Sequence, residues 1–99
     1  ADDVIITGGE KVHPAAVEAV LREHPLVADA RVFGEEDQEW GQRVVAEVAP
    51  VAGASLDPQE LAAHARSRLA GHQVPRRWRL VQEIRRSGMG KLRRGRPPG

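Results

Sequence analysis

The 99-residue sequence contains no cysteine, no tyrosine and only three aromatic side chains, two tryptophans and one phenylalanine. Without thiols the chain cannot form disulfides, bind zinc through thiolates or use a cysteine nucleophile, and we expect a cytoplasmic protein. So few aromatic rings exclude a row of stacking platforms for single-stranded nucleic acid. No apolar run approaches the roughly 18 residues of a membrane span, so none is expected.

Charge is unevenly distributed, although the formal net charge is only +1. Residues 1–74 carry 6 Lys/Arg against 13 Asp/Glu, whereas residues 75–99 carry 9 against 1. Such a basic segment favours phosphate or carboxylate neighbours, from nucleic acid, a nucleotide cofactor or an acidic protein surface. A solvated charged tail is the simpler interpretation of the same pattern.

Hydrophobic alternation and turn residues predict four strands. The first, residues 4–7, ends at Gly8-Gly9, a pair typical of a backbone turn or of a ligand's close approach. The others are expected over residues 27–33, 43–49 and 78–82. In the strand over residues 27–33, we expect one face to carry Ala28, Ala30 and Val32. We expect the acidic stretch 34–39 to be a loop.

Two amphipathic helices are predicted between these strands. One begins at His13-Pro14 and ends before His24-Pro25, and the other is capped by Ser55 or Asp57 and stopped by Gly71, with Leu69 in its apolar stripe. The order β-α-β-β-α-β predicts an α+β fold with antiparallel neighbours. We expect a small, mostly antiparallel sheet of about three strands, plus a short N-terminal hairpin, covered by two helices.

Few residues are candidates for chemistry on spacing alone. The four histidines lack the spacing of metal ligands, so no metal site is expected. Gly88-Met89-Gly90-Lys91 is not a phosphate-binding loop, because it lacks the earlier glycine and Leu92 follows the lysine. Lys91 therefore remains a lone lysine on a glycine-rich segment, which by itself is typical of a solvated side chain.

Several motifs nevertheless occur in one order along nearly the whole chain: residues 2–14 (DDVIITGGEKVHP), 24–25 (HP), 27–30 (VADA), 39–42 (EWGQ), 75–77 (PRR) and 90–94 (GKLRR). Together they resemble the C-terminal domain of acyl- and aryl-coenzyme A synthetases, in the adenylate-forming superfamily that includes luciferases and peptide-synthetase adenylation domains. The sequence departs from that pattern in two places. No Gly-Arg precedes Asp2, and residues 84–87 read IRRS where Leu-Pro-Arg-Thr is common.

The resemblance implies part of an AMP-forming acid–coenzyme A ligase. Such enzymes use ATP and Mg²⁺ to convert a carboxylic acid to an acyl-adenylate, and then transfer the acyl group to coenzyme A. Residues 1–94 would be the mobile C-terminal domain and residues 95–99 a disordered tail. The N-terminal domain that binds ATP and acid would be a partner absent from this chain, so the isolated chain is expected to be inactive. The acid could be o-succinylbenzoate, a fatty acid or an aryl acid.

The resemblance also implies roles for individual residues. Lys91 matches the catalytic lysine of adenylation and Asp2 the hinge residue. Gly8, Gly9 and Glu10 match the loop on the coenzyme A side, and Trp40 and Arg76 match positions that contact coenzyme A in some members. A lysine brought to the reacting phosphate can stabilise the charge that develops there. The alternative is a non-catalytic basic module that binds nucleic acid or an acidic protein through residues 76–96, with steep salt dependence and no special need for Lys91. With the ligase interpretation we expect no nucleic-acid partner.

Overall fold

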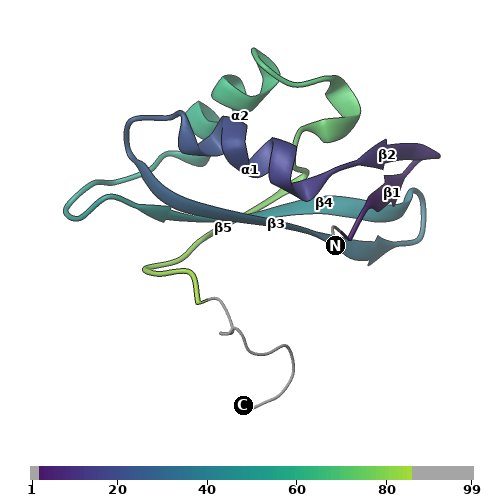
Figure 1. Cartoon of the computed structure of the whole chain (residues 1–99), viewed down its shortest axis with the longest axis horizontal. Coiled ribbons are helices and arrows are strands. Elements are labelled where there is room, and N and C mark those ends of the chain that lie inside the picture. Colours follow the sequence, from purple (N-terminus) through teal and green to yellow (C-terminus); the bar gives the residue numbers. More distant parts are fainter. Residues whose placement is uncertain (1–2, 86–99) are drawn as a thin grey trace.

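The computed structural model describes residues 3–85, in which two helices lie on one face of a small sheet and a hairpin lies at its end (Figure 1). The elements in chain order are β1 (Ile5–Thr7), β2 (Glu10–Val12), α1 (Pro14–Arg22), β3 (Val27–Asp37), β4 (Gly41–Pro50), α2 (Pro58–Arg66), a short 3₁₀ turn η1 (Gly71–Gln73) and β5 (Arg77–Leu80). β1 and β2 form a separate two-stranded sheet, and the larger sheet has the order β3-β4-β5. The predicted α+β fold with an N-terminal hairpin is therefore confirmed. Within residues 3–85, no helix has the length and apolar character needed to cross a membrane.

The helix starts agree with the sequence prediction because their signals are local. α1 begins at Pro14, and the Asp57 carboxylate caps α2 by accepting a hydrogen bond from the Gln59 N–H at 2.9 Å. The expected end of α2 at Gly71 was wrong, since the helix ends at Arg66. The Ser67 hydroxyl donates to the His64 carbonyl at 2.8 Å, which satisfies a carbonyl of the last turn and competes with further helix.

The acidic stretch 34–39 was expected to be a loop, and this prediction was wrong. β3 continues through it to Asp37, with Glu35 opposite Arg43 and Asp37 opposite Gly41. Opposite charges on facing positions stabilise a strand pair, so a run of carboxylates can extend a strand when its partner supplies arginine. Only residues 38–40 remain to make the turn into β4.

The expectation that neighbouring strands are antiparallel holds for β1-β2 and β3-β4 but not for β5, which pairs parallel to β4. The cause is the long connection between β4 and β5, which includes α2 and returns the chain to the end where β4 began. The first residue pair is Val45 with Arg77. This connection brings the segment just before β5 close to the start of β4.

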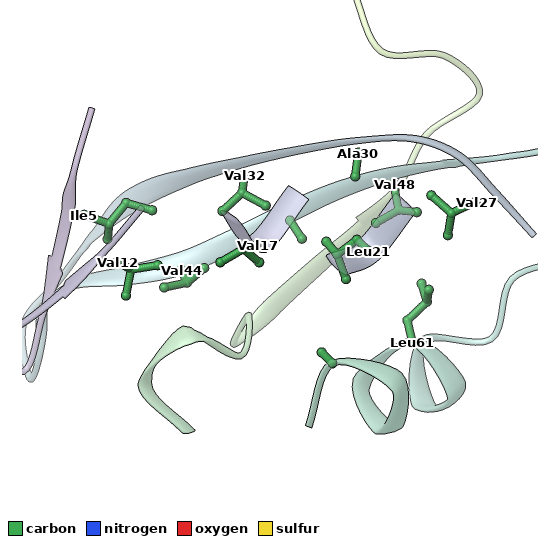
Figure 2. Close-up of a cluster of buried hydrophobic side chains, with 12 residues drawn as sticks. Ile5, Val12, Val17, Leu21, Val27, Ala30, Val32, Val44, Val48 and Leu61 are labelled. Atoms are coloured by element: carbon green, nitrogen blue, oxygen red, sulfur yellow. The ribbon is translucent and has the colours of Figure 1, made fainter. Parts of the chain in front are cut away.

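The core lies between the sheet and the helices, and the hairpin contributes to it (Figure 2). Its largest fully buried side chains include Ile5 and Val12 from the hairpin and Leu21 and Leu61 from the helices. Ala28 was expected to share a face with Ala30 and Val32, but it is exposed while they are buried, because the β3-β4 register shifts between Val27 and Asp29. Since both hairpin strands bury a side chain in the common core, the turn between them is held relative to the sheet.

Candidate functional site

Three segments that are far apart in the sequence meet at the start of β4: the glycine turn of the hairpin, the β3-β4 turn and the residue before β5. The Gly8 N–H donates a hydrogen bond to the Trp40 carbonyl at 2.8 Å. The Arg76 guanidinium carbon lies 4.5 Å from the centroid of the Trp40 ring, a cation–π contact. We call Gly8, Gly9, Trp40 and Arg76 the hairpin-end cluster. These four residues, singled out from the sequence for one site, form a connected set.

Gly8 and Gly9 make the turn between β1 and β2 with φ of +58° and +83°, values that favour glycine. A Cβ added to Gly8 would lie 2.8 Å from Cε3 of Trp40, so the indole packs directly on the Gly8 backbone. A Cβ added to Gly9 would meet no heavy atom within 4 Å. The first glycine is thus needed for packing within the domain, whereas the second leaves open space at the tip. Glu10 is exposed at the first position of β2.

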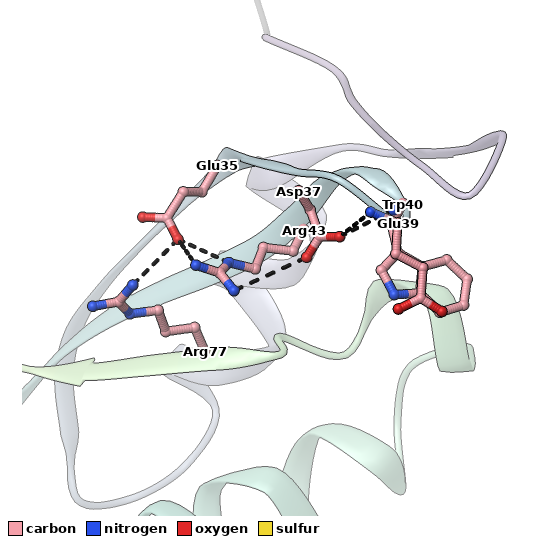
Figure 3. A network of polar contacts seen from close by, with 6 residues as sticks. All are labelled: Glu35, Asp37, Glu39, Trp40, Arg43 and Arg77. Carbon is pink, nitrogen blue, oxygen red and sulfur yellow. Dashed lines mark hydrogen bonds and ion pairs between the residues drawn. The ribbon is translucent and has the colours of Figure 1, made fainter.

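The backbone at Trp40 is held by Asp37. One oxygen of the Asp37 carboxylate accepts hydrogen bonds from the backbone N–H groups of Glu39, at 2.8 Å, and Trp40, at 3.0 Å (Figure 3). These bonds, the Trp40 N–H first, hold the pKa of Asp37 below its ordinary value. Gly41 follows with a φ of +84° and completes the turn. The indole remains 36% exposed, so one part of it faces Gly8 and Arg76 and another faces solvent.

Arg76 is fixed through its backbone and carries its charge at the surface. Its N–H donates to the Val44 carbonyl at 2.8 Å, which continues the β4-β5 pairing by one residue. Among residues 3–85, no salt bridge to Arg76 is found, whereas Arg77 lies 3.3 Å from Glu35. An arginine that stacks on an indole keeps its N–H donors available for an oxyanion such as a phosphate.

The neighbouring face of the sheet carries a charge network of a different kind (Figure 3). Arg43 lies 2.6 Å from Glu35 and 4.0 Å from Asp37, and Arg77 also reaches Glu35. The hydrogen bond from Arg43, followed by the attraction of the nearby arginines, lowers the pKa of Glu35. These arginines are paired with carboxylates of the same domain, whereas Arg76 forms no such salt bridge within residues 3–85 and its charge only contributes, as the smallest effect, to lowering the pKa of Asp37.

Two other predicted residues, Asp2 and Lys91, lie outside the described residues, as does the predicted tail 95–99. Within residues 3–85, no group of three or more His, Cys, Asp or Glu side chains is arranged to hold a metal ion. Two residues that support the hairpin-end cluster had no role assigned from the sequence: Asp37, which accepts from the Trp40 N–H, and Gln42, which accepts from the Ile6 N–H. The signal for Asp37 was present, because Asp commonly caps the backbone two residues ahead in a turn.

A small α+β domain with two helices on one sheet face and a glycine-turn hairpin at its end is also the architecture of the C-terminal domain of adenylate-forming enzymes. The solved structure of o-succinylbenzoate CoA synthetase from Bacillus subtilis, in complex with its acyl-adenylate intermediate, matches this fold with a TM-score of 0.82. The match has 37% identity and covers 91% of this chain and 18% of that one. The family model described as "AMP-binding enzyme C-terminal domain" matches residues 16–91. The chain belongs to this family.

Curated relatives are ligases that act on different acids. A medium/long-chain-fatty-acid–CoA/3-oxocholest-4-en-26-oate–CoA ligase of Mycolicibacterium smegmatis is 49% identical over 87 residues, which are 88% of this chain and 16% of the relative. A 2-succinylbenzoate–CoA ligase of Geobacillus kaustophilus is 49% identical over 92 residues, 93% of this chain and 19% of the relative. The chain thus spans less than a fifth of the length of either.

Proposed function

We propose that this chain is the C-terminal domain of an ATP-dependent acid–coenzyme A ligase and forms the coenzyme A side of its active site. The observation that carries the proposal is the hairpin-end cluster, in which the Gly8-Gly9 turn, the Trp40 ring and the Arg76 guanidinium lie together. Coenzyme A combines phosphates with a long, thin thiol-bearing arm. A cationic group on a flat ring suits the phosphates, and a bare turn leaves room for the arm.

The two half-reactions divide among the residues as follows. In adenylation, the carboxylate of the acid attacks the α-phosphate of ATP and pyrophosphate leaves. Lys91 stabilises the negative charge that accumulates at the reacting centre. In transfer, the thiol of coenzyme A attacks the acyl-adenylate and AMP leaves. Gly8, Gly9 and Glu10 then line the path of the thiol-bearing arm, while Trp40 and Arg76 hold its nucleotide end.

The proposal includes a partner domain. ATP, Mg²⁺ and the acid bind mainly to an N-terminal domain of the same enzyme, against which residues 1–94 rotate about Asp2 between the half-reactions. Its support is that this chain belongs to a family described as a C-terminal domain and spans less than a fifth of much longer ligases. Two relatives with equal identity to this chain act on chemically different acids, which fits a binding site for the acid outside this domain.

A basic module for nucleic acid is the less favoured function. In the described part of the segment 76–96, Arg77 is paired with Glu35 at 3.3 Å and Arg79 with Glu47 at 3.6 Å, both carboxylates of the same domain. Nucleic-acid binding would need such cations to face phosphates. The family membership also points to ligases.

The test is Gly9→Leu in the full-length enzyme. Because a Cβ at Gly9 meets no heavy atom within 4 Å, a leucine side chain would begin in open space and extend into the proposed path of the thiol-bearing arm. We expect transfer from a supplied acyl-adenylate to coenzyme A to slow by at least about tenfold, with adenylation near normal. Adenylation is measured by pyrophosphate exchange and transfer by thioester formation.

Gly53→Leu is the matched control. Gly53 has a φ of +79°, close to that of Gly9, and equally open surroundings, but it follows the opposite end of β4 from the hairpin. Its substitution carries the same backbone strain without entering the proposed site. The proposal would be contradicted if Gly9→Leu slowed adenylation and transfer equally and Gly53→Leu slowed both by the same factor. Gly9 would then have only a structural role in the turn.

A further inference from the structure

The hairpin is joined to the larger sheet by a side chain as well as by backbone. The Ile6 N–H donates to Oε1 of Gln42 at 2.8 Å, and two residues further the Gly8 N–H donates to the Trp40 carbonyl at 2.8 Å. Residues two apart in a strand present their N–H groups on the same edge. One edge of β1 is therefore held by residues 40–42, once through a main-chain carbonyl and once through the Gln42 amide.

The Gln42 side chain has room for this contact because position 34 is glycine. A Cβ added to Gly34 would lie 2.7 Å from Nε2 and 3.2 Å from Cδ of Gln42, and 3.2 Å from Cγ2 of Ile5. The φ of Gly34 is not in the left-handed region, so its backbone does not itself require glycine. The absent side chain instead makes the space that the Gln42 amide and Ile5 occupy.

The hairpin needs such an attachment. β1 and β2 have three residues each, and a two-stranded hairpin is at best marginally stable by itself in water. Burial of Ile5 and Val12 holds the hairpin against the core, but apolar packing is not directional and does not fix the position of a strand along its axis. Hydrogen bonds to Ile6 and Gly8 do fix that position.

We propose that Gln42 is a positioning residue for the hairpin-end cluster, acting through Ile6 to set where the Gly8-Gly9 turn lies relative to Trp40 and Arg76. Gln42 does not itself contact substrate. The inference rests on the proposed function, since the turn placed in this way is the one assigned to the coenzyme A arm. Gln42 therefore has a role in transfer and none in adenylation.

The experiment compares Gln42→Leu with Gln42→Glu in the full-length enzyme. Leucine has similar bulk but no acceptor for the Ile6 N–H, whereas glutamate retains one. We expect amide hydrogen exchange of the segment 3–10 to quicken about tenfold in Gln42→Leu and to stay near wild type in Gln42→Glu. In the same proteins, transfer to coenzyme A should fall roughly tenfold only in Gln42→Leu, with pyrophosphate exchange unchanged in both.

Gly34→Ala is a second route to the same displacement. Its methyl group would displace the far end of the Gln42 side chain, which is flexible, and would also press on Cγ2 of Ile5 at 3.2 Å, which must move by a few tenths of an ångström. We expect the same direction of change as in Gln42→Leu, in both amide hydrogen exchange and transfer. Gln38→Leu is the control. Gln38 is an exposed glutamine in the turn between β3 and β4, four residues before Gln42. It should behave as wild type in both assays.

The outcomes separate the inference from the proposed function. Unchanged exchange of segment 3–10 in both Gln42→Leu and Gly34→Ala would overturn the positioning role, whatever the enzyme catalyses. Faster amide hydrogen exchange of segment 3–10 with normal transfer to coenzyme A would also overturn the positioning role, because the position of the Gly8-Gly9 turn would then not affect transfer. A wild-type enzyme that forms no thioester would refute the proposed function, and with it the positioning role in transfer. Quickened exchange at segment 3–10 would in that case show only that Gln42 holds β1.

Discussion

At the scale of residues, the two glycines of one turn are required for different reasons. Gly8 is packed under the Trp40 ring, and Gly9 has nothing around it. A pair of glycines in a sequence does not reveal this difference, because both have positive φ and both suit a turn. Only the contact of Gly8 with a ring more than thirty residues away makes the first glycine part of the packing, whereas the second lies beside open space.

Arg76 and Arg77 provide a matched pair of adjacent cations. Arg76 stacks on Trp40, whereas Arg77 pairs with Glu35. In the full-length enzyme we expect Arg76→Ala to raise the KM for coenzyme A about tenfold, as loss of one charge-assisted phosphate contact of about 1.5 kcal/mol would do, without slowing pyrophosphate exchange. Arg77→Ala should change this KM little. Steady-state kinetics with varied coenzyme A measures both, and equal increases in the two variants would contradict a specific role for Arg76.

At the scale of elements, the sequence predicted what depends on nearby residues. The start of each helix was foreseen from a proline, with a capping residue as a second signal for α2, and the turn at Gly8-Gly9 from the glycines themselves. The extension of β3 to Asp37 was not foreseen, because it depends on Arg43 and Arg77 from other strands. The parallel pairing of β5 was missed for a similar reason: it follows from how α2 returns the chain to the sheet.

The turn between β3 and β4 leads to a pH-dependent prediction. Hydrogen bonds from the Trp40 and Glu39 N–H groups favour the charged form of Asp37 and lower its pKa in the folded protein. The unfolded chain therefore takes up the proton first as pH falls. The stabilisation by this carboxylate is present at neutral pH and is lost as pH falls below about 4 and through the lowered pKa.

The measurement is urea unfolding of the wild-type protein and of Asp37→Asn at pH 7 and pH 3. Asparagine retains an acceptor oxygen but not the charge, so we expect the wild-type protein to be the more stable at pH 7, with a gap that narrows at pH 3. A gap of the same size at both pH values would show that the charge of Asp37 does not strengthen the turn.

At the scale of the whole molecule, the candidate site exists only because of the topology. The hairpin, the β3-β4 turn and the segment before β5 meet at one end of the sheet, since β5 runs parallel to β4 and begins beside it (Figure 1). The sequence motifs indicated Gly8, Gly9, Trp40 and Arg76 one at a time. Their direct contacts, and the link through Gln42, required the fold, because each contact joins segments more than thirty residues apart.

We propose that this domain serves two half-reactions with two separate sets of residues, the hairpin-end cluster for transfer and Lys91 for adenylation. Lys91 lies outside the described residues and is assigned from its motif, so kinetics is the direct test. Arg93→Ala and Arg94→Ala are the controls, because they remove the same charge from the same basic segment. If only the general charge of the segment mattered, all three substitutions would have similar effects.

The deciding measurement is pyrophosphate exchange by Lys91→Ala in the full-length enzyme, together with thioester formation from a supplied acyl-adenylate. We expect exchange to fall by at least ~10²–10³-fold, typical of removing one group that stabilises charge in a transition state. Transfer should be largely retained, and the two arginine variants should be affected much less. Exchange at the normal rate in Lys91→Ala would contradict the account and leave Lys91 as one more cation of a solvated segment.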